Sequence, residues 1–153
     1  MEDQNLTAAA IVSFSERLED RSTVFYQELA KRLPAYEETF VAFAEQGQKN
    51  KLWVTRTYQE TISDALEACF CFEGLALSNY PLPSKLADDV SNEQALAAAS
   101  ELEDIAIAFY LEAAERSDSL LATVPAAFRR VAKRRAKRKA ILEAMRKSST
   151  ASC

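Results

Sequence analysis

The chain contains no histidine among its 153 residues, and it has only two glycines and four prolines. Without histidine, neither a Ser–His nor a Cys–His nucleophile system can form. The glycines stand apart at Gly47 and Gly74, so no glycine-rich loop is present to hold phosphate groups. The sequence therefore indicates no catalytic residues.

Cysteine is also scarce, with Cys69, Cys71 and Cys153 as the three examples. An odd number without a stapling pattern suits a reducing compartment, and the acidic start does not resemble a secretory signal. No run of about eighteen apolar residues is present, so we expect no membrane span. These observations predict a cytoplasmic protein.

The abundant residues are helix formers, mainly Ala, Leu, Glu, Lys and Arg, which predicts an all-α domain. Proline and small polar residues at 78–84 form the clearest break, which we interpret as a long crossover between two helix pairs. Residues 1–148 are expected to form the bundle and 149–153 a disordered tail. The first expected helix spans about 8–33 and stops before Pro34, and the second spans about 36–61, with an extension toward 77 left open. The third begins after the capping-box pattern Ser91-Asn92-Glu93-Gln94 and runs to about 117, and the fourth spans about 125–147.

An internal repeat supports two equivalent helix pairs. The segment LEDRSTVFYQELAKR begins at Leu18, and LEDIAIAFYLEAAER begins at Leu102, with eight identical positions in fifteen. Each copy is followed by a second long helical stretch, and a helix pair repeated once makes a four-helix bundle. The other interpretation is two similar amphipathic helices that arise from biased composition. Aromatic residues at helical spacing are expected in the core rather than in redox roles, namely Tyr26, Tyr58, Tyr110 and Trp53.

The repeat carries a Glu seven residues before a Tyr, as Glu19 with Tyr26 and as Glu103 with Tyr110. In this respect it resembles the metal-binding helices of the rubrerythrin-type, ferritin-like superfamily. The resemblance implies a ferritin-like four-helix bundle with two irons in its core. It also implies that Glu19 and Glu103 occupy the bridging-carboxylate positions, with Tyr26 and Tyr110 as nearby core aromatics.

The same resemblance places a Glu-x-x-His pair on each of the other two helices. In this chain Gly47 and Asn50 occupy one pair of positions, and Arg135 and Arg138 occupy the other. A cationic side chain cannot ligate a metal cation, and two carboxylates without imidazole make a poor iron site. The sequence therefore predicts that the metal ligand set is degenerate.

Two carboxylates in a core without metal would need compensating charge, because buried charge must be paired. We therefore interpret Arg135 and Arg138 as ion-pair partners of Glu19 and Glu103. This hypothesis describes a non-catalytic protein without cofactor, in a binding or structural role.

Two alternatives to this interpretation stay open. In one, the last helix is rotated so that Arg135 and Arg138 are solvated and the two glutamates lie at the edge of the bundle. In the other, an atypical iron site, helped by Glu16 or Glu45, supports iron oxidation or peroxide reduction.

Charge is unevenly distributed along the chain. Residues 1–128 carry 22 acidic and 9 basic residues, whereas residues 129–153 carry 10 basic and 1 acidic residue. The segment 129–139 should expose a face that we call the basic ridge, formed by Arg129, Arg130, Lys133, Arg134 and Lys137.

This ridge has three interpretations. In the first, it is a solvated face near the acids Glu101, Glu112 and Glu115. In the second, it is a docking surface for an acidic protein or for a second copy in a homodimer. In the third, it binds phosphate groups or nucleic acid. The strongly acidic remainder of the chain argues against a nucleic-acid partner.

Overall fold

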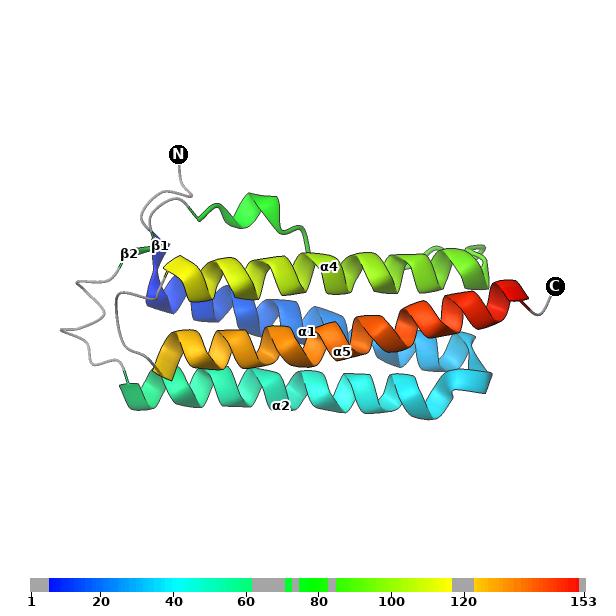
Figure 1. The fold of residues 1–153 in the computed structure, drawn as a ribbon, viewed down its shortest axis with the longest axis horizontal. Helices are drawn as coiled ribbons and strands as arrows, with labels where there is room; N and C mark the ends of the chain where they lie inside the picture. Colours follow the sequence, from blue (N-terminus) through cyan, green and yellow to red (C-terminus); the bar gives the residue numbers. More distant parts are fainter. Residues whose placement is uncertain (1–5, 62–70, 73–74, 83–84, 117–122, 152–153) are drawn as a thin grey trace.

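A computed structural model describes residues 6–61, 71–72, 75–82, 85–116 and 123–151, and within them the chain forms four long helices. Figure 1 shows them lying side by side along one axis. None of these described helices combines the length and apolar character needed to traverse a bilayer. The helices are α1 (Ala8–Arg32), α2 (Glu37–Thr61), α4 (Asn92–Arg116) and α5 (Thr123–Ala151).

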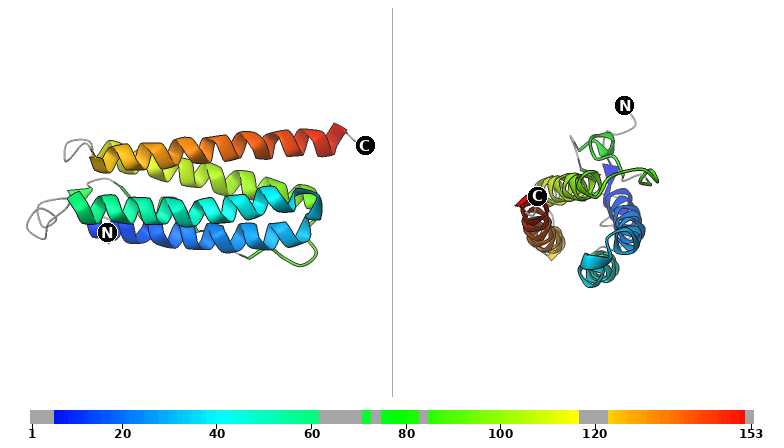
Figure 2. Two further views of the ribbon diagram at one scale, coloured as in Figure 1. Left: turned by 90° about the horizontal axis from the view of Figure 1, so that it is seen from below. Right: turned by 90° about the vertical axis from the view of Figure 1, so that its right-hand side faces the viewer.

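The helices pack as two pairs, α1 with α2 and α4 with α5, and the pairs meet mainly through α2 against α5. Figures 1 and 2 show that α1 and α5 run in one direction and that α2 and α4 run in the other. The chain leaves α2 at one end and returns along the bundle before α4 begins at the opposite end. The predicted all-α four-helix bundle is therefore confirmed, with its crossover between the two pairs.

Local hydrogen bonds explain where two of the helices begin. Thr7 caps α1, because its Oγ1 accepts from the backbone N–H of Ala10 at 3.1 Å. Ser91 precedes α4 and forms a reciprocal capping box with Gln94, with N···O distances of 2.9 and 3.1 Å. The capping pattern predicted from the sequence thus sets the start of α4.

Proline positions shape the other helix boundaries. Helix α1 ends before Pro34, and a 3₁₀ turn, η1 (Pro34–Tyr36), leads into α2. Pro125 lies in the first turn of α5, where its missing N–H is tolerated. No glycine or proline follows it, and α5 continues to Ala151, into the segment expected to be a disordered tail. Residues 152–153 and the possible extension of α2 over 62–70 lie outside the described residues.

The crossover lies against α1 and α4. It contains β2 (Cys71–Phe72), which pairs antiparallel with β1 (Leu6–Thr7), and the short 3₁₀ helix η2 (Leu77–Asn79). Tyr80 packs against Phe109 of α4 and donates a hydrogen bond to Glu112. These contacts attach the crossover to the bundle. Of the three cysteines, Cys71 lies in β2, and Cys69 and Cys153 fall outside the described residues.

Each helix buries one inward row, and the rows include charged residues. Arg135 and Arg138 are buried in α5, so the alternative with a rotated last helix does not describe the structure. The buried inward rows are Val12, Glu19 and Tyr26 in α1 with Leu33 directly after its end, Phe40, Phe43, Gly47, Asn50 and Val54 in α2, Leu96, Glu103 and Tyr110 in α4, and Phe128, Val131, Arg135, Arg138, Leu142 and Met145 in α5.

Candidate functional site

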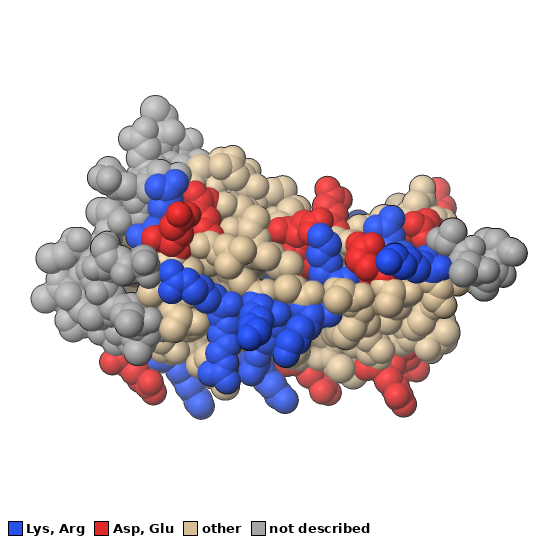
Figure 3. Space-filling model, in the orientation of Figure 1, with Lys and Arg blue, Asp and Glu red and all other residues tan. Residues whose placement is uncertain are grey.

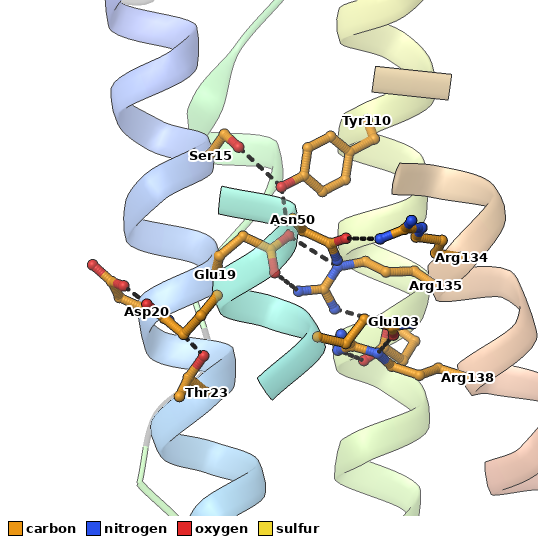
Figure 4. Close-up of polar contacts among 12 residues, drawn as sticks. Ser15, Glu19, Asp20, Thr23, Asn50, Glu103, Tyr110, Arg134, Arg135 and Arg138 are labelled. Atoms are coloured by element: carbon orange, nitrogen blue, oxygen red, sulfur yellow. Dashed lines mark hydrogen bonds and ion pairs between the residues drawn. The ribbon is translucent and has the colours of Figure 1, made fainter. Parts of the chain in front are cut away.

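Four charged side chains meet in the middle of the bundle, and we call them the buried quartet: Glu19, Glu103, Arg135 and Arg138. Glu19 comes from α1, Glu103 from α4 and both arginines from α5 (Figure 4). Glu19, Glu103 and Arg135 are 0% exposed, and Arg138 is 1% exposed. The quartet has no formal net charge, because two carboxylates face two guanidinium groups.

Arg135 bridges the two carboxylates. Its Nη2 and Nε donate to the two oxygens of Glu19 at 2.8 and 3.3 Å, and its Nη1 donates to Glu103 Oε1 at 2.8 Å. Burial alone would lower the pKa of Arg135, but the charges of Glu103 and Glu19 raise it well above its ordinary value. The guanidinium therefore stays charged and holds both carboxylates in place.

Arg138 completes the charge balance with a looser geometry. Its Nη1 donates to Glu103 Oε2 at 3.4 Å, and its Nε donates to Gln46 Oε1 at 3.0 Å. Its guanidinium carbon also lies 5.5 Å from the ring centre of Tyr26 and 5.2 Å from that of Phe43, a cation–π arrangement. Within the described part of the chain, its buried Nη2 finds no hydrogen-bond acceptor.

Two tyrosines cross between the repeats to reach the carboxylates. Tyr26 of α1 donates to Glu103 Oε2 at 2.5 Å, and Tyr110 of α4 donates to Glu19 Oε2 at 2.6 Å. Ser15 Oγ lies 2.9 Å from the Tyr110 hydroxyl and serves as its donor, because that hydroxyl already donates to Glu19. Burial and the neighbouring carboxylate raise the pKa of both tyrosines well above the ordinary value.

Helix α2 approaches the quartet with small or neutral residues. A Cβ built on Gly47 would lie 3.3 Å from Glu19 Oε1 and 3.0 Å from Thr23 Oγ1. The backbone of α2 therefore comes close to Glu19 without contributing a ligand atom. Asn50 is fully buried and accepts from Arg134 at 3.4 Å, and its Nδ2 meets no acceptor among the described residues.

The donor set does not fit the iron centre that the resemblance implies. A cation between Glu19 and Glu103 would compete with the guanidinium of Arg135, which already bonds both carboxylates. Glu16 instead accepts from Thr55 at 2.8 Å, and Glu45 is exposed. No group of three or more His, Cys, Asp or Glu side chains arranged for a metal occurs in the described residues.

The basic ridge occupies the outer face of α5. Arg129, Arg130, Lys133 and Lys137 are exposed, and Arg134 is half-buried. Figure 3 shows lysine and arginine side chains gathered on this face. The acidic neighbours considered from the sequence lie on α4, and Glu112 among them pairs with Arg116 at 3.2 Å rather than with the ridge.

Two residues of these sites were not assigned from the sequence, and the contacts of a third were not foreseen. Ser15 lies one helical turn before Glu19, and that spacing alone could have suggested its place beside the carboxylate. Gln46 carried no comparable signal, because the row of buried positions in α2 bypasses it. Trp53, expected in the core, is half-buried and packs against it, and it also lies under the guanidinium groups of Arg130 and Arg134.

No protein-family model matches this chain, and no curated protein or solved structure is significantly similar to it.

Proposed function

We propose that this protein is a non-catalytic relative of the rubrerythrin-type, ferritin-like proteins, with a structural or binding role. In this proposal the buried quartet replaces the metal layer of the family. The observation that carries it is the position of Arg135, whose guanidinium bonds both Glu19 and Glu103 at 2.8 Å. A fixed positive charge then performs the neutralising task that metal ions perform between bridging carboxylates.

The arrangement of the repeats supports the same proposal. Equivalent glutamates on α1 and α4 face each other, and each accepts from the tyrosine of the other repeat. The equivalent positions on α2 and α5 differ. Position 47 on α2 is a glycine without a side chain, and position 135 on α5 is an arginine. The guanidinium of Arg135 lies between the two carboxylates from α5, and Gly47 lets the backbone of α2 come close to Glu19.

Metal content tests this proposal. Protein produced in iron-supplemented medium and purified without chelator should contain far less than one iron per chain. It should also neither oxidise ferrous iron nor reduce peroxide above the level of buffer. About two metal ions per chain, the number in the family's di-iron site, would contradict the proposal if Glu19→Ala removed them together. Lys133→Ala, which changes an exposed residue, is the matched control.

The assembly state belongs to the same proposal. We expect a structural or binding protein of this kind to associate with itself or with an acidic protein. Light scattering across a range of protein concentrations measures self-association directly. If the protein is a monomer at every concentration, the homodimer is excluded, and a binding role would require an acidic protein as the partner.

A further inference from the structure

The basic ridge extends onto the neighbouring helix. In α2, Lys49 and Arg56 stand four residues before and three residues after Trp53, so the three share one helical face. Trp53 is in contact with the ridge, because Arg130 lies 4.2 Å from its ring centre. Together the ridge and these residues of α2 form one positively charged surface across two packed helices.

Among the residues that the structure describes, most charges of the ridge have no carboxylate partner. Within the described ranges, Arg130, Lys133, Arg134 and Lys137 form no ion pair with a carboxylate. Bases elsewhere on the molecule do form such pairs, as Lys51 does with Asp20 at 3.0 Å and Arg146 with Glu93 at 3.1 Å. Lys139, next to the ridge, pairs with Asp104. The ridge is therefore a local surplus of positive charge on a chain whose net charge is −4.

Trp53 holds two of these guanidinium groups in place. Arg130 and Arg134 lie 4.2 and 5.2 Å from its ring centre, and Arg134 also donates to Asn50 at 3.4 Å. Stacking on an aromatic ring leaves the edge N–H groups of a guanidinium free to bond carboxylate oxygens. Because these side chains are already ordered, a ligand would lose less conformational entropy on binding them.

We propose that this surface docks an acidic segment of a partner protein, with Glu or Asp side chains on one face of a helix. Lys133 and Lys137 repeat at the i, i+4 spacing of about 6 Å, which matches acidic side chains at the same spacing on a partner helix. From Arg129 to Lys137 the ridge is about 12 Å long at 1.5 Å per residue, which suits a short helical segment. This proposal is independent of the origin of the buried quartet.

Nucleic acid fits the surface less well for two reasons. Residues 1–128 carry 22 acidic and 9 basic residues, which would repel a polyanion extending past the ridge. In addition, the ring of Trp53 is covered by arginines, so it offers no open face on which a base could stack. The observations therefore favour a short acidic protein segment.

Trp53 also provides the assay, because it is the only tryptophan of the chain. The probe is a synthetic alanine-rich helical peptide with glutamates at i, i+4 spacing. Its addition should change the fluorescence of Trp53 in a saturable manner, and the apparent affinity should fall as salt rises from about 50 to 200 mM. A peptide with glutamine in place of glutamate should give no change.

Charge reversal on the ridge locates the binding surface. The variant Lys133→Glu/Lys137→Glu should bind the peptide at least about tenfold more weakly, a change of about 1.4 kcal/mol. The control Lys31→Glu/Lys147→Glu changes two exposed lysines outside the ridge and has the same net charge. It should bind nearly as the unaltered protein does. Circular dichroism melting shows that both variants are folded before binding is compared.

Three results would overturn the proposal. The first is no fluorescence change with the acidic peptide at low salt. The second is an equal loss of binding in the ridge variant and in the control, which would indicate a net-charge effect. The third is binding of random duplex DNA tighter than about micromolar at near-physiological salt, beyond the usual non-specific range. That last result would make the ridge a nucleic-acid surface.

Discussion

Tyr110 of α4 donates a 2.6 Å hydrogen bond to Glu19 of α1, although the two residues are 91 positions apart in the sequence. Tyr26 makes the equivalent bond to Glu103. Each tyrosine follows its own repeat's glutamate by seven residues, yet it bonds the glutamate of the other repeat. The two repeats are therefore joined by exchanged hydrogen bonds, and Arg135 links the same two carboxylates.

Removal of Arg135 should destabilise the bundle more than removal of any exposed base. Arg135→Met leaves Glu19 and Glu103 buried without their shared partner, which should lower the free energy of unfolding by about 3–5 kcal/mol. Urea denaturation followed by circular dichroism measures this change. Lys133→Ala, at an exposed position two residues earlier, should change stability by less than about 0.5 kcal/mol.

Arg134 would be a less suitable control than Lys133, since Arg134 contacts Asn50 and Trp53.

A second test adds Glu19→Gln to Arg135→Met. Because one stranded charge is then removed, the double variant should recover part of the lost stability. Small and equal effects of Arg135→Met and Lys133→Ala on the free energy of unfolding would show that the quartet does not stabilise the bundle.

Stability should fall at alkaline pH because of the two buried tyrosines. Burial and the adjacent carboxylates raise the folded-state pKa of Tyr26 and Tyr110 above the unfolded value of about 10. The unfolded chain thus loses these protons first, so their contribution is complete below about pH 10 and is lost as the pH rises further. Tyrosinate absorbance near 295 nm should appear for these residues only together with unfolding.

The double variant Tyr26→Phe/Tyr110→Phe checks this assignment. It should be less stable at neutral pH by about 1.5–3 kcal/mol for each hydrogen bond lost to a charged group. Its stability should also decline less steeply above pH 10 than that of the unaltered protein. An unchanged slope would mean that other groups govern the alkaline transition.

Introducing the metal ligands of the proposed ferritin-like relatives should create a metal site if the quartet replaces one. The variant Gly47→Glu/Asn50→His/Arg135→Glu/Arg138→His would present four carboxylates, those of Glu19 and Glu103 included, and two imidazoles. We expect it to bind Co²⁺, with visible absorption bands, and to melt at a higher temperature with the metal than without it. The unaltered protein should show neither effect.

Replacing Glu19 and Glu103 with glutamine in that variant is the matched control, because it removes the two bridging carboxylates. A folded variant with all six ligands that binds no Co²⁺ would argue against the proposed relation to di-iron proteins. The new side chain at position 47 needs a small shift of Glu19 and Thr23, since a Cβ there lies 3.3 and 3.0 Å from their oxygens.

The capping box of α4 offers a local test of stability. Ser91→Ala removes the hydroxyl that accepts from the N–H of Gln94, and it should lower the free energy of unfolding by about 1 kcal/mol. Thermal unfolding measures the change. Ser91→Asp, which preserves an acceptor at the cap, should retain most of the stability, and equal losses in both variants would indicate a different role for Ser91.

Much of the fold follows from local signals in the sequence. The scarcity of glycine and proline predicts long helices, Pro34 and the Ser91–Gln94 pattern mark boundaries that the structure has, and the break around 78–84 lies in the crossover. Helix α5 shows the weakness of such signals at a chain end. Its last residues are small and polar but contain no residue that stops a helix, and the helix continues to Ala151.

The inward row of each helix could also be read from the sequence, because a helix places residues seven apart on one face. The seven-residue spacing put Glu19 and Tyr26 on one buried face, and the three-residue spacing put Arg135 and Arg138 on another. Neither spacing could show which tyrosine meets which glutamate. The exchange of Tyr26 and Tyr110 between repeats arises from the antiparallel packing of α1 and α4, which no single helix encodes.

Trp53 and Gln46 show what the tertiary structure alone decided. Both lie on α2, and both contact arginines of α5 that are more than 75 residues away in the sequence. The sequence by itself determined the helices and their inward rows, and it favoured the compensation of two glutamates by two arginines. Packing of α2 against α5 determined the partners, because direction and distance between helices depend on how their side chains interlock.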